Sequence, residues 1–168
     1  MVLFAADLHL GQRTVCRWRQ QFSSVEEHDA VVTENILRQL NKNTVLYLLG
    51  DVVISWSGWN SIRAFRDTGA KVILIPGNHC TEQFSMGRLA VEYDEIHASL
   101  CKYGMWLTHQ PLHPDHLRGK LCVHGHLHDK VIEDDRYLCV SLEQTGYRAI
   151  SLDEVRQIFS NRDQLTKV

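Results

Sequence analysis

The sequence lacks any long uninterrupted run of apolar residues. Its apolar start, Met1 to Ala6, has no basic lead-in, and Asp7 interrupts it far short of a signal peptide or a membrane-spanning helix. These absences predict a soluble, cytoplasmic protein with no membrane partner.

An excess of positive charge is also missing. The 18 lysines and arginines are outnumbered by 20 acidic residues, and the formal net charge is −2. A long polynucleotide therefore meets no global basic field that would hold it by counterion release. Nucleic acid is not a favoured partner, and it would have to be gripped locally.

The cysteines show no C-x-x-C spacing. They are five, an odd number, at Cys16, Cys80, Cys101, Cys122 and Cys139. This argues against both a disulfide framework and a zinc-thiolate site. We expect most of them to be reduced, and several to pack as small hydrophobic residues in strands.

No internal repeat, low-complexity segment or linker divides the chain. At 168 residues and 44% hydrophobic composition it is long enough for one well-buried core and too short for two ordinary domains. We expect a single domain over residues 1–168.

Strands and helices alternate in the first half of the chain. Continuous apolar runs predict strands at residues 2–6, 44–49 and 71–75. Ser24-Val25-Glu26-Glu27 fits a capping box and predicts a helix to about Asn41, and a short helix is expected at 59–67.

The second half changes to closely spaced strands. After a short helix at 86–91, strands are expected at 95–100, 105–108, 120–124, 137–142 and 148–150, with a closing helix at 153–159. This order indicates an α/β first half and a β-rich second half around a shared core.

Five short polar motifs each follow directly on an apolar, strand-like run. In chain order they are Asp7-Leu8-His9, Gly50-Asp51, Gly77-Asn78-His79, Thr108-His109 and Gly125-His126-Leu127-His128. Each alone is common in turns and caps. Side chains at several strand ends can nevertheless converge, and the strand ends of an α/β sheet are where ligands gather. Their joint occurrence therefore predicts a site.

The residue types in these motifs suit two metal ions. Asp7 and His9 are two residues apart, so both side chains point the same way if strand geometry persists. Asp51 offers a carboxylate whose two oxygens can bridge two cations. One carboxamide oxygen and three imidazoles complete the set, at Asn78, His109, His126 and His128. This number of donors fits two ions that share one bridge.

In this order the motifs D-x-H, G-D, G-N-H, H and G-H-x-H resemble those of the calcineurin-like metallophosphoesterase superfamily, over residues 7–128. Residues 22–28, the helix after them and residues 48–51 are similar to the small single-domain members from bacteria and phages. Residues 7–11 also resemble the start of the exonuclease branch, whose longer enzymes carry additional domains.

The resemblance implies the fold class α/β, a two-sheet β-sandwich flanked by helices in the four-layer α-β-β-α metallophosphoesterase fold. It implies a first metal held by Asp7, His9, Asp51 and His128, and a second held by Asp51, Asn78, His109 and His126. It also implies that His79 is a catalytic histidine that holds no metal.

Two positions depart from the family pattern. The family usually has an acidic residue after the histidine of G-N-H, where this chain has Cys80. A partner that orients His79 is therefore missing or supplied elsewhere. Thr108 stands where many relatives have serine, so a hydroxyl is retained.

The expected activity is that of a metal-dependent phosphoesterase, most of all a phosphodiesterase. Two cations about 3.5–4 Å apart would each hold a phosphate oxygen and convert a bridging water to hydroxide, which attacks phosphorus in line. His79 as imidazolium would protonate the leaving oxygen, a contribution of about 10²–10⁴-fold. Mixed nitrogen and oxygen ligation suits divalent transition metals, and we expect Mn, with Fe, Co, Ni or Zn as alternatives.

Loops that follow the ligand-bearing strand ends are expected to border the site. They carry a mixture of cationic and aromatic side chains, namely Arg13, Arg17, Trp18, Arg19, Trp56 and Trp59. Of these we expect Arg13, Arg17, Trp18 and Trp56 to bind substrate, by stacking on a base or pairing with a phosphate. Packing of the tryptophans against their own loops is an equal alternative.

The other histidines receive different interpretations. His124 is expected to support a ligand or to pack in the core rather than to hold a metal. His28, His113 and His116 are expected at the surface or in loops, and residues 133–135 in a solvated turn.

Three functions fit these observations. The leading hypothesis is hydrolysis of a small, compact phosphoester such as a nucleotide. The second is a nuclease acting on DNA or RNA ends, suggested by the opening motif. The third, a non-catalytic metal-binding scaffold of the same fold, predicts a degraded ligand set, whereas every ligand position is filled. The sequence gives no indication of the oligomeric state.

Overall fold

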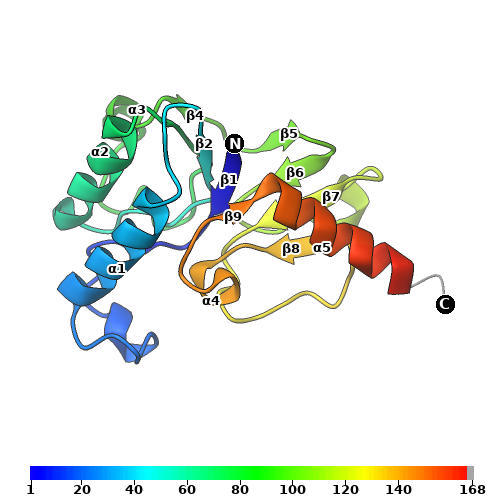
Figure 1. Cartoon of the computed structure of the whole chain (residues 1–168), viewed down its shortest axis with the longest axis horizontal. Coiled ribbons are helices and arrows are strands. Elements are labelled where there is room, and N and C mark those ends of the chain that lie inside the picture. The colour runs from blue at the N-terminus through cyan, green and yellow to red at the C-terminus, as the bar shows by residue number, and fades with distance from the viewer. Residues whose placement is uncertain (166–168) are drawn as a thin grey trace.

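The computed structural model describes residues 1–165 and contains two β-sheets (Figure 1). The five-stranded sheet has the order β4-β3-β2-β1-β9, with β9 antiparallel to β1 and the other neighbours parallel. Its strands are β1 (Val2–Ala5), β2 (Val45–Leu48), β3 (Lys71–Leu74), β4 (Glu95–Ile96) and β9 (Ile150–Ser151).

The four-stranded sheet has the order β5-β6-β7-β8. Its strands are β5 (Leu100–Lys102), β6 (Met105–Leu107), β7 (Leu121–His124) and β8 (Tyr137–Cys139). β5 runs antiparallel to β6, whereas β6, β7 and β8 are parallel, so three strands end at the same edge.

Alternation along β1 explains the layering. Leu3 and Ala5 face a core shared with the helices of the first half, whereas Phe4 and Ala6 face a core shared with the four-stranded sheet. Strands that are buried on both faces read as continuous apolar runs, which is why these segments could be recognised in the sequence. The five-stranded sheet is therefore the central layer.

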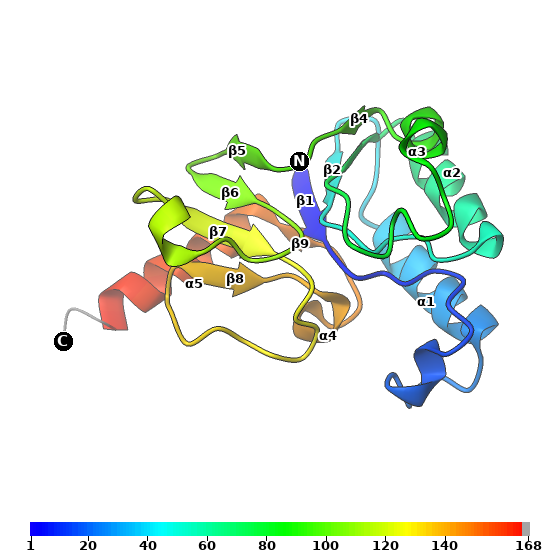
Figure 2. The same ribbon diagram turned by 180° about the vertical axis from the view of Figure 1, so that it is seen from behind.

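Three helices cover the outer face of the five-stranded sheet: α1 (Val25–Leu37), α2 (Trp59–Asp67) and α3 (Met86–Glu92). Both views place them together on one side of β1, away from the four-stranded sheet (Figures 1 and 2). Ser24 caps α1 by accepting a hydrogen bond from the Glu27 backbone. The Glu27 carboxylate reaches back to Ser23 instead of Ser24, a variant of the expected capping box.

The other side of the molecule carries α5 (Leu152–Leu165), whose Val155 and Phe159 pack at the core between the sheets. The short α4 (Leu142–Thr145) follows β8. Three 3₁₀ turns lie in the connections, η1 (Val15–Arg17), η2 (Trp56–Gly58) and η3 (Pro114–His116). Leu117, which follows η3, packs on the outward-facing Cys122 and Tyr137 of the second sheet.

The expected fold of two sheets flanked by helices is confirmed. One expected strand, 95–100, is wrong: residues 97–99 separate β4, which extends the first sheet, from β5, which begins the second. The helix expected to reach Asn41 ends at Leu37. The strand expected to reach Leu142 ends at Cys139, and α4 begins at Leu142. Within the described residues, no helix is long and apolar enough to cross a membrane.

Candidate metal centre

The predicted motifs meet where the two sheets join. Ala6 forms a parallel bridge with Ser141, and its amide donates to the Val140 carbonyl, which ties the end of β1 to the chain that leaves β8. The first three motifs follow the parallel strands β1, β2 and β3, and the last two follow β6 and β7. Both sheets thus bring their carboxyl ends to one place.

Six of the seven predicted ligands form two compact groups. The first group is Asp7, His9 and His128, and the second is Asp51, His109 and His126; in each, one ligand atom per residue lies within 4.8 Å of the others. The seventh, Asn78, places its Oδ1 3.1 Å from His109 Nε2. The fold therefore brings together all seven side chains, from positions as far apart as 7 and 128.

The backbone at these ligands is unusual. Among the described residues, eight other than glycine have a positive φ, and five of those are predicted ligands: Asp7, His9, Asp51, His126 and His128. Such a conformation costs on the order of 1 kcal/mol or more per residue and is typical of functional sites. The strand geometry expected at Asp7 and His9 does not persist. Left-handed turns, not strand alternation, direct both side chains to one place.

Three motif glycines allow this crowding. A Cβ on Gly77 would lie 2.2 Å from Asp51 Oδ1, and one on Gly50 would lie 2.2 Å from His109 Nδ1. A Cβ on Gly125 would lie 2.6 Å from both Ala6 Cβ and Asp7 Oδ2. At each of these positions the backbone lies so close to a candidate ligand or to the residue beside it that only glycine fits.

In the first group, the two oxygens of Asp7 have different environments. Oδ2 accepts hydrogen bonds from Ser141 Oγ at 2.6 Å and from the His126 backbone at 2.8 Å. Oδ1 is buried without a hydrogen-bond partner and lies 3.9 Å from the Nε2 atoms of both His9 and His128. Both His9 nitrogens are likewise buried without a partner.

In the second group, lone pairs converge on one nitrogen. His109 Nδ1 lies 2.9 Å from the Leu49 carbonyl, which can only accept, so Nδ1 carries the hydrogen and Nε2 is unprotonated in the neutral ring. Around Nε2 lie Asn78 Oδ1 at 3.1 Å, Asp51 Oδ2 at 3.2 Å and His126 Nδ1 at 3.3 Å. With the ring neutral, four electron-rich atoms therefore face one another. A proton on Nε2 that is donated to Asp51 Oδ2 also relieves this arrangement, and although burial opposes it, the hydrogen bond with Asp51 raises the pKa of His109.

The pKa values reflect this crowding. Burial, helped by the charge of Arg19, lowers the pKa of His9 to about 3, so this ring is neutral near pH 7 and its lone pair is free. Burial raises the pKa of Asp7 despite the Ser141 hydrogen bond. Burial opposes the ionisation of Asp51 too, but its hydrogen bond and charge interaction with His109 prevail and lower the pKa of Asp51.

These groups fit metal cations. Buried polar atoms without partners are rare because desolvation costs on the order of 1–3 kcal/mol. A cation among Asp7 Oδ1, His9 and His128 would satisfy the partnerless atoms, and one beside His109 Nε2 would offset the facing lone pairs. Mixed carboxylate, carboxamide and imidazole donors suit divalent transition metals.

His79 lies beside the first group without belonging to it. Its ring centroid is 5.9 Å from that of His9, and its backbone amide donates to Asp51 Oδ1 at 2.9 Å. Its Nδ1 lies 2.8 Å from Glu82 Oε1, so a carboxylate three residues later is the orienting partner. Cys80, at the position where an acidic partner for His79 is expected, is buried instead in the core beneath the helices.

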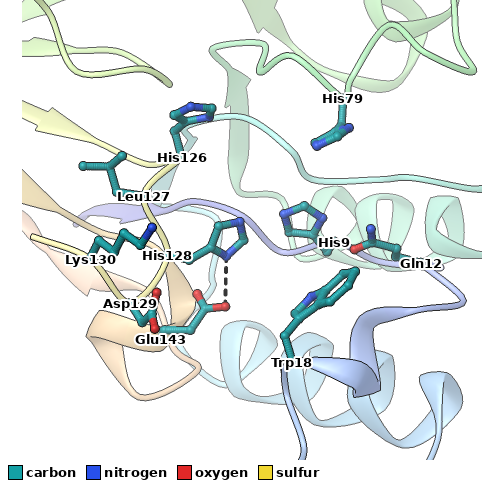
Figure 3. A pocket seen from close by; sticks show the side chains of 10 residues that line it. All are labelled: His9, Gln12, Trp18, His79, His126, Leu127, His128, Asp129, Lys130 and Glu143. Carbon is teal, nitrogen blue, oxygen red and sulfur yellow. Dashed lines mark hydrogen bonds and ion pairs between the residues drawn. The ribbon is translucent and has the colours of Figure 1, made fainter.

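A pocket of about 680 Å³ opens over these side chains (Figure 3). His9, His79, His126 and His128 line it together with the half-exposed Trp18. The rest of the lining is Gln12, Leu127, Asp129, Lys130 and Glu143. Asn78 and His109 line a second hollow, which shares no lining residue with the main pocket.

Of the predicted substrate-binding residues, only Trp18 lines the main pocket. Arg13 and Arg17 are exposed outside its lining, and Trp56 packs edge-on against Phe84. Arg19 and Trp59 do not line the pocket, and for Trp59 the alternative of packing in the protein holds. Both are buried, Trp59 in the helix-side core and Arg19 beneath the Asp7–His9 turn.

The expectation that His28 lies at the surface or in a loop is wrong, because it is fully buried in α1. His124 is buried with Nδ1 2.7 Å from the Gly125 carbonyl, in keeping with a supporting or core position. His113 and His116 are exposed, as expected.

Two acidic residues at the site escaped sequence reasoning. Glu143, on α4, lies 3.0 Å from His128 Nδ1 (dashed in Figure 3), and this hydrogen bond raises the pKa of His128. No local pattern marks Glu143, since it is 15 residues from His128. Glu82 could have been predicted as the partner of His79, because it follows three residues later and one turn of the chain brings residues at this spacing together.

Known proteins with related sequences or folds agree with this geometry. Residues 1–166 match the model of the calcineurin-like phosphoesterase family. Gene 66 protein of Mycobacterium phage L5 is 26% identical over 94% of this chain and 93% of its own length. The crystal structure of AQ665 from Aquifex aeolicus, a protein of unknown function, has a TM-score of 0.73 at 24% identity, covering 94% of this chain and 98% of that one. This chain therefore belongs to the calcineurin-like phosphoesterase family, as a metal-dependent phosphoesterase with two candidate metal-binding groups.

Proposed function

We propose that the protein is a phosphodiesterase that hydrolyses a compact, nucleotide-like phosphoester. The observation that carries this proposal is the position of both ligand groups at the floor of one pocket. His9 and His128 of the first group and His126 of the second line it, beside the candidate acid His79.

The geometry supports the following ligand assignment. Asp7, His9 and His128 would hold one divalent transition-metal ion, and Asn78, His109 and His126 the other, with Asp51 between them. Asp51 contacts His109 of the second group, and its charge also acts on His9 of the first. When bound, two such ions neutralise phosphate charge and activate water as a nucleophile. Mn is our proposed metal, with Fe, Co, Ni and Zn as alternatives.

His79 would protonate the leaving oxygen. Glu82 accepts from Nδ1, which leaves Nε2 as the position from which the imidazolium donates. The His79 backbone amide donates to the Asp51 carboxylate at 2.9 Å, and this hydrogen bond fixes the position of the candidate acid relative to the candidate ligands. The proton thus moves from His79 Nε2 to the ester oxygen as the bond to phosphorus breaks.

Two separate hollows lined by candidate ligands favour a diester. A diester carries two substituents, and the main pocket and the hollow beside Asn78 and His109 offer one space to each. The main pocket is large enough for a nucleoside. Trp18, 54% exposed at its wall, offers a face on which a base can stack.

A nuclease acting on strand ends is less favoured. Lysine and arginine are represented in the described lining of the main pocket by Lys130 alone, too little to follow a polynucleotide backbone. A non-catalytic scaffold is disfavoured because the donor set is complete.

Turnover of model substrates tests the proposal. We expect Mn-dependent hydrolysis of bis(p-nitrophenyl) phosphate faster than that of p-nitrophenyl phosphate, and loss of both activities after chelation. Faster monoester hydrolysis would overturn the diester preference. No turnover by a folded protein shown to contain two metals would overturn the enzymatic proposal. Cyclic nucleotides, linear nucleotides and oligonucleotides, compared under several metals, then distinguish a small substrate from nucleic acid.

A further inference from the structure

We infer that the buried Arg19 and its partner Glu143, which is 16% exposed and lines the pocket, act as positioning residues for the first ligand group, Asp7, His9 and His128. This inference rests on the proposed two-metal assignment. It adds that one of the two subsites is held in shape by a salt bridge between the η1 segment and α4, two parts of the chain 124 residues apart.

Arg19 supports the backbone of the ligand turn. Its guanidinium is 1% exposed and donates to the Asp7 carbonyl at 2.6 Å and to the Leu8 carbonyl at 3.2 Å. Asp7 and His9 have φ values of 57° and 52°, and although their amides donate to the Gly50 and Asp51 carbonyls at 3.0 and 2.9 Å, no backbone amide in the described part of the chain donates to the Asp7 or Leu8 carbonyl. Arg19 thus satisfies two carbonyls that the left-handed conformation turns inward.

Glu143 connects the same guanidinium to the third ligand. Its Oε1 accepts from Arg19 Nε at 2.8 Å and from His128 Nδ1 at 3.0 Å. Because Nδ1 carries the hydrogen, His128 presents an unprotonated Nε2 toward Asp7 Oδ1. One carboxylate oxygen therefore sets the tautomer and orientation of His128, and Arg19 holds that carboxylate in place.

The remaining contacts of Arg19 fix its own position. Its Nη1 lies 2.8 Å from His28 Nε2, which must accept because a guanidinium has no lone pair to offer. His28 Nδ1 then donates to Asp29 Oδ1 at 2.8 Å, and Asp29 Oδ2 accepts from the Gly11 amide at 2.7 Å. The network thus anchors both ends of the ligand turn to α1.

The second group is held differently. His109 is fixed by the Leu49 carbonyl, and Asp51 by the His79 amide. Within the described part of the chain, neither Arg19 nor Glu143 hydrogen-bonds to Asp51, His109 or His126. Loss of the pair should therefore weaken one subsite and spare the other.

Metal binding by the unloaded protein tests this selectivity without substrate. Mn²⁺ is titrated calorimetrically into metal-free protein, and bound metal is counted after dialysis. We expect two sites in the original chain. In Glu143→Ala, one site should weaken by roughly 10–100-fold while the other is unchanged. Glu143→Gln keeps an oxygen that accepts from His128 and should recover most of the affinity.

Arg19→Met should weaken the same site, with Arg17→Met, an exposed arginine on η1, as the matched control. Circular dichroism and Tm verify folding. If Arg19→Met does not fold, the two variants Glu143→Ala and Glu143→Gln still decide the test. Unchanged affinity at both sites in Glu143→Ala, or equal weakening of both, would overturn the inference alone. Failure of the original chain to bind two metals would instead overturn the proposed two-metal function.

Discussion

The carboxylate of Glu82 lies 2.8 Å from Nδ1 of His79, although the residue that follows His79 is a buried cysteine. The family resemblance leads us to expect an acidic partner at position 80, and Glu82 supplies one two positions later. Both side chains are substantially exposed, 38% for His79 and 57% for Glu82, so water competes with this contact.

The His79–Glu82 contact predicts a graded series of rates. Glu82→Ala should lower kcat by roughly 2- to 5-fold, because an exposed pair contributes about 0.3–1 kcal/mol. Glu82→Gln retains an acceptor and should lie nearer the original rate. His79→Ala should keep both metals and lose about 10²–10⁴-fold in kcat. Steady-state kinetics with metal analysis measures the series, and loss of an ion from His79→Ala would show that this histidine is a ligand.

Asp51→Asn should reduce metal content and abolish turnover. The substitution keeps the shape of the side chain but removes the charge that faces His109 Nε2 at 3.2 Å. It also replaces the carboxylate that is proposed to bridge the two ions by a weaker donor. Metal analysis and activity measure both effects. Asp135→Asn, at an exposed aspartate, is the control for the change in net charge. Two bound metals with ordinary turnover in Asp51→Asn would contradict the assignment.

Gly77→Ala should impair the site through volume alone. The added methyl would lie 2.2 Å from Asp51 Oδ1 and 2.8 Å from the Asp51 amide, so the carboxylate must move. Overpacking of this kind costs about 1–3 kcal/mol of unfolding free energy, and we expect weaker metal binding as well. Gly87→Ala, on α3 with its nearest neighbour at 3.9 Å, should cost nothing. Urea unfolding compares the two, and equal stabilities would contradict this account.

Trp18→Ala should raise KM for a nucleotide substrate about tenfold with little change in kcat, because stacking on one base contributes about 1–3 kcal/mol. A phosphodiester without an aromatic group should show no such change. Trp56→Ala removes a tryptophan that is 64% exposed but lies outside the pocket lining, and it should leave KM unaltered. An effect of Trp56→Ala as large as that of Trp18→Ala would argue against a stacking role for Trp18.

Glu154 near the start of α5 should stabilise the fold in a pH-dependent manner. The hydrogen bond from Arg148, helped by the Ser151 backbone, lowers the pKa of Glu154 from 4.5 to about 2. A carboxyl group whose pKa is lower in the folded than in the unfolded protein stabilises the fold at pH values above its unfolded-state pKa. This stabilisation is lost as the pH falls from about 4.5 to about 2. Because the side chain is 40% exposed, screening reduces its contribution to about 0.5–1 kcal/mol.

Glu154→Gln should accordingly lower the unfolding free energy at pH 7, and the difference from the original chain should shrink as pH approaches 2.5. Urea unfolding at several pH values measures this trend. Glu133→Gln, at an exposed glutamate, controls for the lost charge. A difference that stays constant with pH would show that the ionised carboxylate is not the cause.

Much of the fold could be predicted from the sequence because the strands of the first sheet are buried on both faces. Their continuous apolar runs gave β1, β2 and β3 to within two residues at each end. The break at residues 97–99 could not be found in this way. Residues 95–100 read as one extended segment, and only sheet pairing separates β4 from β5.

The candidate ligands could be named from the sequence because metal chemistry restricts their types and because strands end at recognisable motifs. The sequence by itself determined the family, and it predicted the seven candidate donors and the candidate acid. Tertiary structure decided the rest: the left-handed turns that aim Asp7 and His9, the burial of Arg19, and the contacts of Glu82 and Glu143. The physical reason is that a donor is specified by its own chemistry. The direction and protonation of a donor are specified by neighbours that folding brings from distant parts of the chain.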